Sequence, residues 1–265
     1  MVRLVSRMTR RALVAIACWL PILVQAQCTK AIVSADPSYP PLHWFDGQTM
    51  QGASVAIIKR VLDDLKIAYE VRYIGPLTRV MNAAERGEID IVVTLKKTPE
   101  RELFLLYPKT PALDNPVAVF TARDRPIKFT GRADLVGLNG GIARGNVFGD
   151  GFDEYLEKNL TVEVADSPEN NFGKLALGRI DYFITGYYAG MAYLLKRGDE
   201  NRFKVEIPFL VNTPNFVTVT RKGHCAGQLE AIDAQLAQLK KAGVLANLAR
   251  QSFVTWKAQP IVVSN

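Results

Sequence analysis

Few side chains in this sequence have the types and spacing that catalysis or metal binding requires. The chain has two histidines, His43 and His224, and no Cys/His/carboxylate spacing in it suits a zinc site. It has no G-x-S-x-G nucleophile elbow and no dinucleotide fingerprint, and the stretch "GGIARG" at 140–145 lacks the lysine of a phosphate-binding loop. We therefore expect no metal, no cofactor and a binding function, not an enzymatic one.

One short phrase occurs twice and indicates how the chain is organised. Residues 86–93 read RGEIDIVV, and residues 177–184 read LGRIDYFI. In both copies a helix-like segment ends on glycine, one residue intervenes, and Ile-Asp opens an apolar run typical of a buried strand. A capped helix followed by a strand is common, so the echo of Asp90 and Asp181 alone could be chance. The alternation of strand and helix signals along the rest of the chain favours two similarly built lobes.

Residues 1–26 have the composition of a secretory signal peptide. An apolar run at 12–24, interrupted by Pro21, is too short to span a bilayer comfortably, and small residues precede a cleavage site after Ala26. Four arginines form the basic region before it: Arg3, Arg7, Arg10 and Arg11. We expect export to the periplasm; a retained membrane anchor is the alternative.

Removing this peptide changes the inferences from charge and cysteine content. The formal net charge of +7 includes the four arginines, and cleavage leaves 29 basic against 26 acidic side chains. No clustered basic stripe with interleaved aromatics is present, so we expect no nucleic-acid partner. Cys18 leaves with the peptide, and two cysteines in an exported chain favour one disulfide between Cys28 and Cys225.

The mature sequence alternates strand and helix signals, which is typical of an α/β protein with mainly parallel sheets. The expected strands are 31–35, 69–74, 89–95, 115–124, 136–142, 161–165, 180–186 and 216–223. The expected helices begin at 52, 77, 98, 152, 167, 229 and 244. A disulfide at Cys225 would return the C-terminal part to the first lobe, so the chain would cross between lobes near 116–121 and 212–218. Two such crossings form a hinge beside a cleft.

Six motifs in this order, after a signal peptide, resemble the bacterial extracellular solute-binding proteins of family 3, the amino-acid-type binding components of ABC importers. They are DPSYPPLHWFDG (36–47), AERGEIDIVV (84–93), TPER (98–101), IARGNVF (142–148), LGRIDYFITG (177–186) and VTVTRKG…LKKAGVLANLARQSF near the C-terminus. The resemblance covers nearly the whole mature chain. It implies the type II periplasmic-binding fold, with lobe 1 at 27–117 and 217–265 and lobe 2 at 118–216. It also implies a monomer with a small-molecule ligand and an inner-membrane ABC permease as partners.

The resemblance also implies a ligand-binding set. The position matching Arg101 holds a ligand α-carboxylate in typical members, and a guanidinium suits this role because it offers parallel donors to two oxygens. The turn at Arg144-Gly145-Asn146 supplies donors from the second lobe, and Asp36 and Tyr39 match the segment that places an aromatic wall on the ligand. The full expected set is Asp36, Tyr39, Arg79, Thr94, Lys96, Arg101, Arg144, Asn146, Gly186 and Tyr187.

The sequence departs from the family pattern at three places. Gly186 occupies the position where amino-acid binders have an Asp that pairs with the ligand ammonium. The loop before TPER is one residue short and carries Lys96-Lys97 where a small hydroxyl residue is usual, and Arg79 stands where a helix begins near the cleft. Four cations (Arg79, Lys96, Arg101 and Arg144) without a clear carboxylate partner favour an organic anion. The alternative ligand is an amino acid whose ammonium meets an aromatic face such as Tyr187.

Two other function classes remain open at this point. Secreted cyclohexadienyl dehydratases resemble this family and need a general acid, for which Asp36, Glu100 and His43 are candidates without a recognisable catalytic partner. A ligand-sensing module of a signalling protein is the third class. We expect a periplasmic solute-binding protein for a small carboxylate-bearing ligand.

Overall fold

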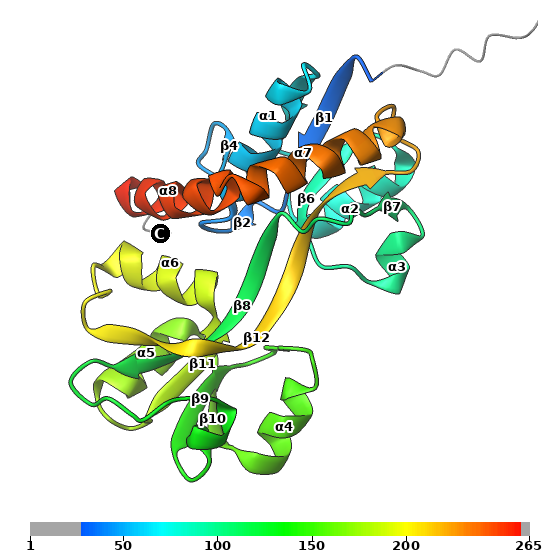
Figure 1. Cartoon of the computed structure of the whole chain (residues 1–265). Coiled ribbons are helices and arrows are strands. Elements are labelled where there is room, and N and C mark those ends of the chain that lie inside the picture. Colours follow the sequence, from blue (N-terminus) through cyan, green and yellow to red (C-terminus); the bar gives the residue numbers. More distant parts are fainter. Residues whose placement is uncertain (1–27, 261–265) are drawn as a thin grey trace, which may run out of the picture.

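The computed structural model describes residues 28–260, which form two α/β lobes joined by two long strands (Figure 1). The expected signal peptide lies outside the described residues. The strands follow the order β10-β9-β11-β8-β12-β6-β1-β5, and β7 also pairs with β12. The two strands common to both lobes are β8 (Leu113–Ala122) and β12 (Phe203–Thr220). Within 28–260, none of the helices combines the length and apolar character needed to cross a bilayer.

The first lobe is built on a parallel core of β5 (Ala68–Val71), β1 (Lys30–Ser34) and β6 (Ile91–Leu95). Its long helices bury one apolar face each; Val55, Ile58 and Leu62 of α1, for example, are almost fully buried. These helices are α1 (Ala53–Asp64), α2 (Leu77–Arg86), α7 (Leu229–Lys241) and α8 (Val244–Ala258). Shorter elements are β2 (Ser38–Tyr39), β3 (His43–Phe45), β4 (Met50–Gln51), α3 (Pro99–Glu102), β7 (Leu105–Leu106) and the 3₁₀ turn Ala226–Gln228.

The second lobe repeats this plan with its own core. Its parallel strands are β10 (Thr161–Ala165), β9 (Asn139–Ala143) and β11 (Tyr182–Gly186), and β11 runs antiparallel to β8. The flanking helices are α4 (Phe152–Asn159), α5 (Pro168–Ala176) and α6 (Tyr187–Arg197), with a 3₁₀ turn at Arg132–Leu135. Phe120, Phe172 and Phe183 meet edge to face or tilted in its core. Each lobe therefore has its own hydrophobic core, and Tyr188 of α6 packs into that of the first lobe.

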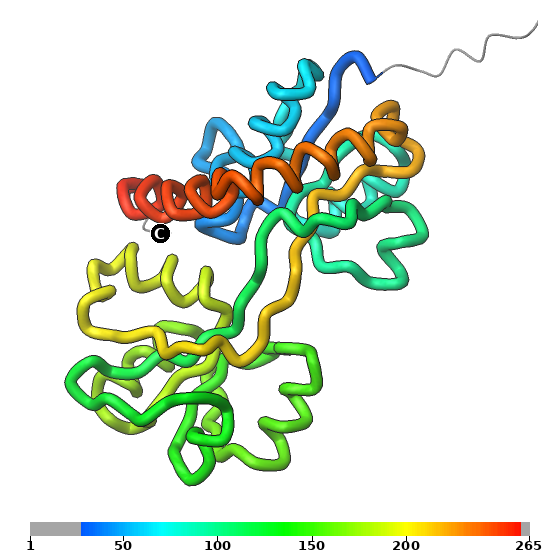
Figure 2. The backbone as a smooth tube through the Cα atoms, in the orientation of Figure 1, coloured from blue at the N-terminus to red at the C-terminus, as the bar shows by residue number. Residues whose placement is uncertain are grey.

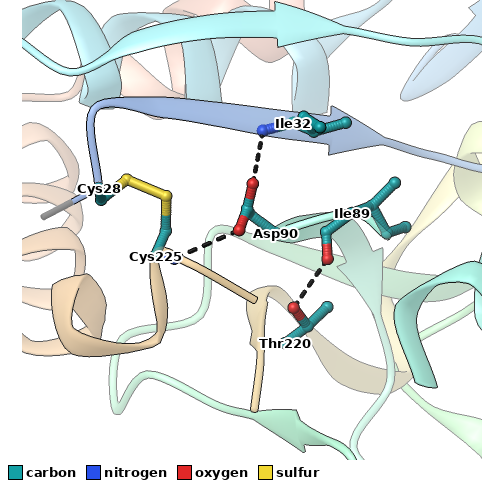
Figure 3. Close-up of a disulfide and its surroundings, with 6 residues drawn as sticks. All are labelled: Cys28, Ile32, Ile89, Asp90, Thr220 and Cys225. Carbon is teal, nitrogen blue, oxygen red and sulfur yellow. Dashed lines mark hydrogen bonds between the residues drawn. A yellow bond between two sulfur atoms is a disulfide. The ribbon is translucent and has the colours of Figure 1, made fainter. Parts of the chain in front are cut away.

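The two Ile-Asp phrases have the same structural role in the two lobes. The carboxylate of Asp90, before β6, accepts the N–H of Ile32 in the neighbouring strand β1 at 2.9 Å and the N–H of Cys225 at 3.2 Å (Figure 3). The carboxylate of Asp181, before β11, accepts the N–H of Asn139 in the neighbouring strand β9 at 2.8 Å. The repeated phrase thus marks, in each lobe, an aspartate whose carboxylate links two adjacent parallel strands.

Replacing these two aspartates should have unequal effects on stability. Asp90 is buried, so Asp90→Ala leaves two backbone N–H groups without an acceptor and should lower the free energy of unfolding by about 3 kcal/mol. Asp181 is partly exposed, and water can replace its single contact, so Asp181→Ala should cost less than about 1 kcal/mol. Urea unfolding of the mature protein measures both values. Equal losses would contradict the argument that burial of Asp90 and its second contact make it the more important of the two.

Cys28 and Cys225 form a disulfide across a sequence separation of 197 residues, as expected from the cysteine content (Figure 3). The bond joins the segment before β1 to the turn after β12, and both lie in the first lobe. The C-terminal helices α7 and α8 accordingly pack with the first lobe (Figure 1). The chain crosses between lobes in β8 and β12, and the expected lobe boundaries at 117 and 217 fall within these strands. The exact boundaries stay a prediction.

The lobes also touch through two helices, outside the crossing strands. Figure 2 shows α8 of the first lobe lying beside α6 of the second. Trp256 Nε1 donates to the carbonyl of Ala192 at 2.9 Å, and Lys196 Nζ donates to the carbonyl of Gln259 at 2.7 Å. Phe253 packs near the ring of Tyr187, with centroids 5.8 Å apart. The two lobes are therefore joined by two strands and by contacts between two helices.

Two expectations about elements need correction, and one long helix was missed. The strand expected at 216–223 is the end of an 18-residue strand that begins at Phe203 and stops at Thr220, where a turn begins. The strand expected at 136–142 begins only at Asn139, because the preceding residues close the 3₁₀ turn. Helix α6 was not expected. The other expected elements overlap observed ones.

Candidate functional site

A hollow of about 190 Å³ lies on the first lobe where it meets the crossing strands. Its wall includes the end of β6, the segment around β2 and the first turn of α3, and β8 and β12 contribute one residue each. This is the carboxyl edge of the parallel strands, where open α/β sheets bind ligands. Five residues of the expected set line it: Asp36, Tyr39, Thr94, Lys96 and Arg101.

Arg101 is held in place by its own loop. Thr98 caps α3 by accepting the N–H of Arg101 at 3.4 Å, and Pro99 occupies the first helical position. The guanidinium donates from Nη1 to the carbonyl of Lys96 at 2.9 Å, and the hydroxyl of Tyr107 donates to the same carbonyl at 3.1 Å. In the described part of the chain, Arg101 has no ion pair with a carboxylate. Its remaining donors are therefore available to an anionic ligand.

Thr94 adopts a backbone conformation that is rare for its residue type. Its φ of 61° lies in the left-handed region, which a β-branched residue enters at a cost of about 1–3 kcal/mol. Its hydroxyl donates to Oγ of Ser54, which secures the strand end from the side of α1. Such strained residues concentrate at binding and catalytic sites. The conformation therefore supports a functional role for this end of β6.

Tyr39 connects the hollow to the crossing strands and to the second lobe. Its hydroxyl donates to Oδ1 of Asn115 in β8 at 2.8 Å, and burial raises the pKa of the phenol above its usual value, so it stays protonated. A Cβ placed on Gly186 would lie 4.0 Å from the Tyr39 hydroxyl oxygen. Gly186 ends β11 and precedes α6, so the second lobe approaches the hollow at this point.

The other expected residues of the second lobe do not line the hollow. Arg144 forms an exposed ion pair with Asp166 at 2.7 Å, so the expectation that Arg144 lacks a carboxylate partner is wrong. Asn146 lies on the same loop and is partly exposed. Tyr187 packs against Phe209, with ring centroids 5.5 Å apart. The structure therefore does not bring these three residues to the hollow.

Arg79 also lies outside the hollow. It is an exposed residue of α2, and its Nη1 donates to the carbonyl of Ile74 at a long 3.4 Å. Two cations of the expected cluster, Lys96 and Arg101, thus line the hollow together with one carboxylate, Asp36. The hollow therefore combines two positive charges with one negative charge, whereas the sequence predicted four cations without a clear carboxylate partner.

Three polar residues at the hollow were not expected as ligand contacts. Asn115 of β8 and Asn215 of β12 reach it from the crossing strands, and His43 reaches it from β3. The predicted crossings near 116–121 and 212–218 were a usable signal for the two asparagines, because Asn115 adjoins the first crossing and Asn215 lies within the second. His43 was considered only as a catalytic acid.

The part of the chain between residues 28 and 260 contains no group of three His, Cys, Asp or Glu side chains placed to hold a metal ion.

The comparison with protein families identifies one match. The model of the bacterial extracellular solute-binding proteins, family 3, matches residues 31–255. A search of curated proteins gives no match.

Three solved structures of similar fold are distant in sequence. The second substrate-binding domain of a putative amino acid ABC transporter from Streptococcus pneumoniae has a TM-score of 0.70 at 16% identity, over 84% of this chain and 99% of that one. Substrate-binding domain 2 of GlnP from Lactococcus lactis, in an open conformation, has a TM-score of 0.69 at 17% identity, over 84% of this chain and 95% of that one. The probable amino-acid ABC transporter extracellular-binding protein YtmK from Bacillus subtilis has a TM-score of 0.68 at 17% identity, over 85% of this chain and 97% of that one.

At such identities the likeness shows the fold, and it confirms the expected two-lobed type II periplasmic-binding architecture. The family match extends over most of the sequence and includes every residue that lines the hollow. This chain belongs to the bacterial extracellular solute-binding proteins of family 3.

Proposed function

We propose that this protein captures a small carboxylate-bearing ligand, an amino acid or a related organic anion, between its lobes in the periplasm and delivers it to an ABC importer. The observation that carries the proposal is the guanidinium of Arg101. It is fixed at the hollow by contacts to its own loop and, within the described residues, has no carboxylate partner. Lys96 adds a second positive charge at the same place.

Capture would work by closure of the lobes. The hollow is formed by the first lobe and the crossing strands, so a ligand there leaves one side to be covered by the second lobe. Gly186 and the loop at 144–146 are the candidates for that covering surface. A ligand that touches both lobes binds the closed arrangement better than the open one and shifts the equilibrium toward it. The permease would then recognise the closed shape.

A ligand screen tests the proposal directly. The mature protein, from Gln27 onward, is assayed by thermal shift and calorimetry against amino acids, mono- and dicarboxylates, and neutral sugars. We expect carboxylates to raise the melting temperature, because a ligand that binds only the folded state stabilises it. Stabilisation by neutral sugars and by no carboxylate would contradict the proposal.

One observation keeps an enzymatic alternative testable. Asp36 and His43, two of the three candidate general acids, line the hollow, whereas Glu100 is exposed and lies outside it. An enzyme of the cyclohexadienyl dehydratase type would convert prephenate or arogenate to an aromatic product. We expect no aromatic absorbance to appear when the protein is incubated with either compound. Formation of product would show that the protein is an enzyme and would contradict the proposed binding function.

A further inference from the structure

The two faces of the crossing strands β8 and β12 have different surroundings. Successive residues of a strand point to opposite faces, and residues paired across antiparallel strands share a face. Asn115 and Asn215 line the hollow. Asp114, Pro116 and Asn212 line a second cavity of about 440 Å³, and Asn212 is paired with Pro116. The second cavity therefore lies on the face of the strands opposite to the hollow.

On this opposite face the helices of the two lobes meet. The second cavity is also lined by Tyr187 and Tyr188 of α6 and by Phe253 of α8. Figure 1 shows α6 and α8 together on one side of the crossing strands, and α3 and α4 on the other side. Arg101 of α3 lines the hollow. The hollow and the meeting point of α6 and α8 thus lie on opposite sides of the crossing strands.

Two polar side chains bridge the lobes at this meeting point. Nε1 of Trp256 on α8 donates to the carbonyl of Ala192 on α6 at 2.9 Å. Nζ of Lys196 on α6 donates to the carbonyl of Gln259 at 2.7 Å and lies 4.3 Å from the centre of the Trp256 ring, which is the geometry of a cation–π interaction. We call this set of interactions the α6–α8 contact.

Movement of the second lobe over the hollow would affect the α6–α8 contact directly. A hinge rotation about the two crossing strands narrows one of their sides and widens the other. The hollow lies on the side that narrows, so α6 and α8 move apart and the bonds of Trp256 and Lys196 lengthen. In the structure these bonds are made while no helix or loop of the second lobe, within residues 28–260, lines the hollow. They therefore stabilise the uncovered arrangement relative to a closed one.

We propose that the α6–α8 contact keeps the second lobe away from the hollow and sets how readily the lobes close. The proposal rests on the proposed function, because closure is the step that would capture the ligand. The apparent affinity for a ligand falls with the fraction of protein that is in the binding-competent arrangement. Trp256 and Lys196 would thus tune the affinity without touching the ligand.

The test measures the distance between the lobes in the mature protein without any ligand. Spin labels are attached at Leu103→Cys, which directly follows α3 and is 80% exposed, and at Lys158→Cys on α4, whose side chain is 73% exposed. The native disulfide stays oxidised, and double electron–electron resonance gives the distribution of distances between the labels. We expect one dominant distance, and a shorter one from closed molecules. Trp256→Ala should raise the ratio of the shorter to the longer distance at least fivefold.

A pair of lysine variants provides a second measurement and its matched control. Lys196→Met removes the ammonium group from the α6–α8 contact and should raise the same ratio at least twofold; it also serves if Trp256→Ala does not fold. Lys174→Met is the control. Nζ of Lys174 donates to Glu163 at 2.7 Å, and both residues belong to the second lobe, so this variant loses a bond of the same length that does not join the lobes. Its ratio should equal that of the wild-type protein.

The outcomes distinguish this inference from the proposed function. An unchanged or smaller ratio in either folded variant of the α6–α8 contact, or an equal rise in Lys174→Met, would overturn the inference and leave solute binding to the ligand screen. Failure of every carboxylate in that screen would overturn the proposed function. The distance measurement would still decide whether the α6–α8 contact holds the lobes apart, because it uses no ligand.

Discussion

Replacing both cysteines by serine is expected to lower the free energy of unfolding by up to about 5 kcal/mol. The bond between Cys28 and Cys225 closes a loop with a sequence separation of 197 residues, and in the chain-entropy model such a cross-link removes much conformational freedom from the unfolded chain. Its loss would also loosen the turn whose N–H contacts Asp90. Urea unfolding of the oxidised protein and of Cys28→Ser/Cys225→Ser measures the difference.

The control for this prediction is the reduced wild-type protein. It has the same sequence as the oxidised form, so any change in the unfolding midpoint on reduction reports the bond alone. The reduced protein and the double variant should unfold at similar urea concentrations. Coincident curves for the oxidised and reduced proteins would show that the bond contributes little to stability.

Substitution Arg101→Ala is expected to weaken binding of the best carboxylate ligand at least tenfold, which corresponds to about 1.4 kcal/mol. The guanidinium offers charge-assisted donors to the ligand and, within the described residues, has no carboxylate that competes for them. Arg101→Lys keeps the charge but loses the planar pair of donors, so it should restore only part of the affinity. Calorimetry with each variant gives the values.

Arg86→Ala is the matched control for this substitution. Arg86 lies on α2, is exposed, and does not line the hollow. Its Nε lies 2.5 Å from Oε1 of Glu88. Its removal changes the net charge by the same amount as Arg101→Ala, and the affinity should stay within twofold of wild type. Arg101→Ala with unchanged affinity would remove this residue from the site.

Local sequence signals predicted the repeated plan of the lobes and the disulfide. Gly87 caps α2 in the left-handed conformation, and Thr98 and Ser167 begin helices with proline at the next position, so these signals act over a few residues. The pairing of Cys28 with Cys225 followed from export and from there being two cysteines in the mature chain.

Other elements are set by partners that are distant in sequence. β12 contains Pro208 and Pro214, which are typical of turns, yet it continues as one strand. Pro214 lies opposite Asp114 of β8, and Pro208 lies between the two segments paired with β8, Phe203–Glu206 and Val211–Asn215, where the register shifts. The strands β2, β3 and β4 have two or three residues each and are stabilised by pairing with one another. Hydrophobic periodicity cannot indicate such short strands.

The candidate site was predictable where one segment builds it. Arg101 follows from the motif TPER, and Tyr39 from the segment before two prolines, and both line the hollow. Asn115 and Asn215 are 100 positions apart in the sequence and come together only because β8 and β12 cross side by side. The ion pair of Arg144 with Asp166 depends on the register between β9 and β10, which no local signal specifies.

The central claim is that the two lobes close on a small acid held at Arg101. Small-angle X-ray scattering of the mature protein, with and without a saturating amount of the tightest carboxylate from the screen, tests it most directly. We expect a smaller radius of gyration with ligand, and a smaller decrease for Arg101→Ala at a ligand concentration that only just saturates the wild-type protein. An unchanged radius at saturation would contradict closure.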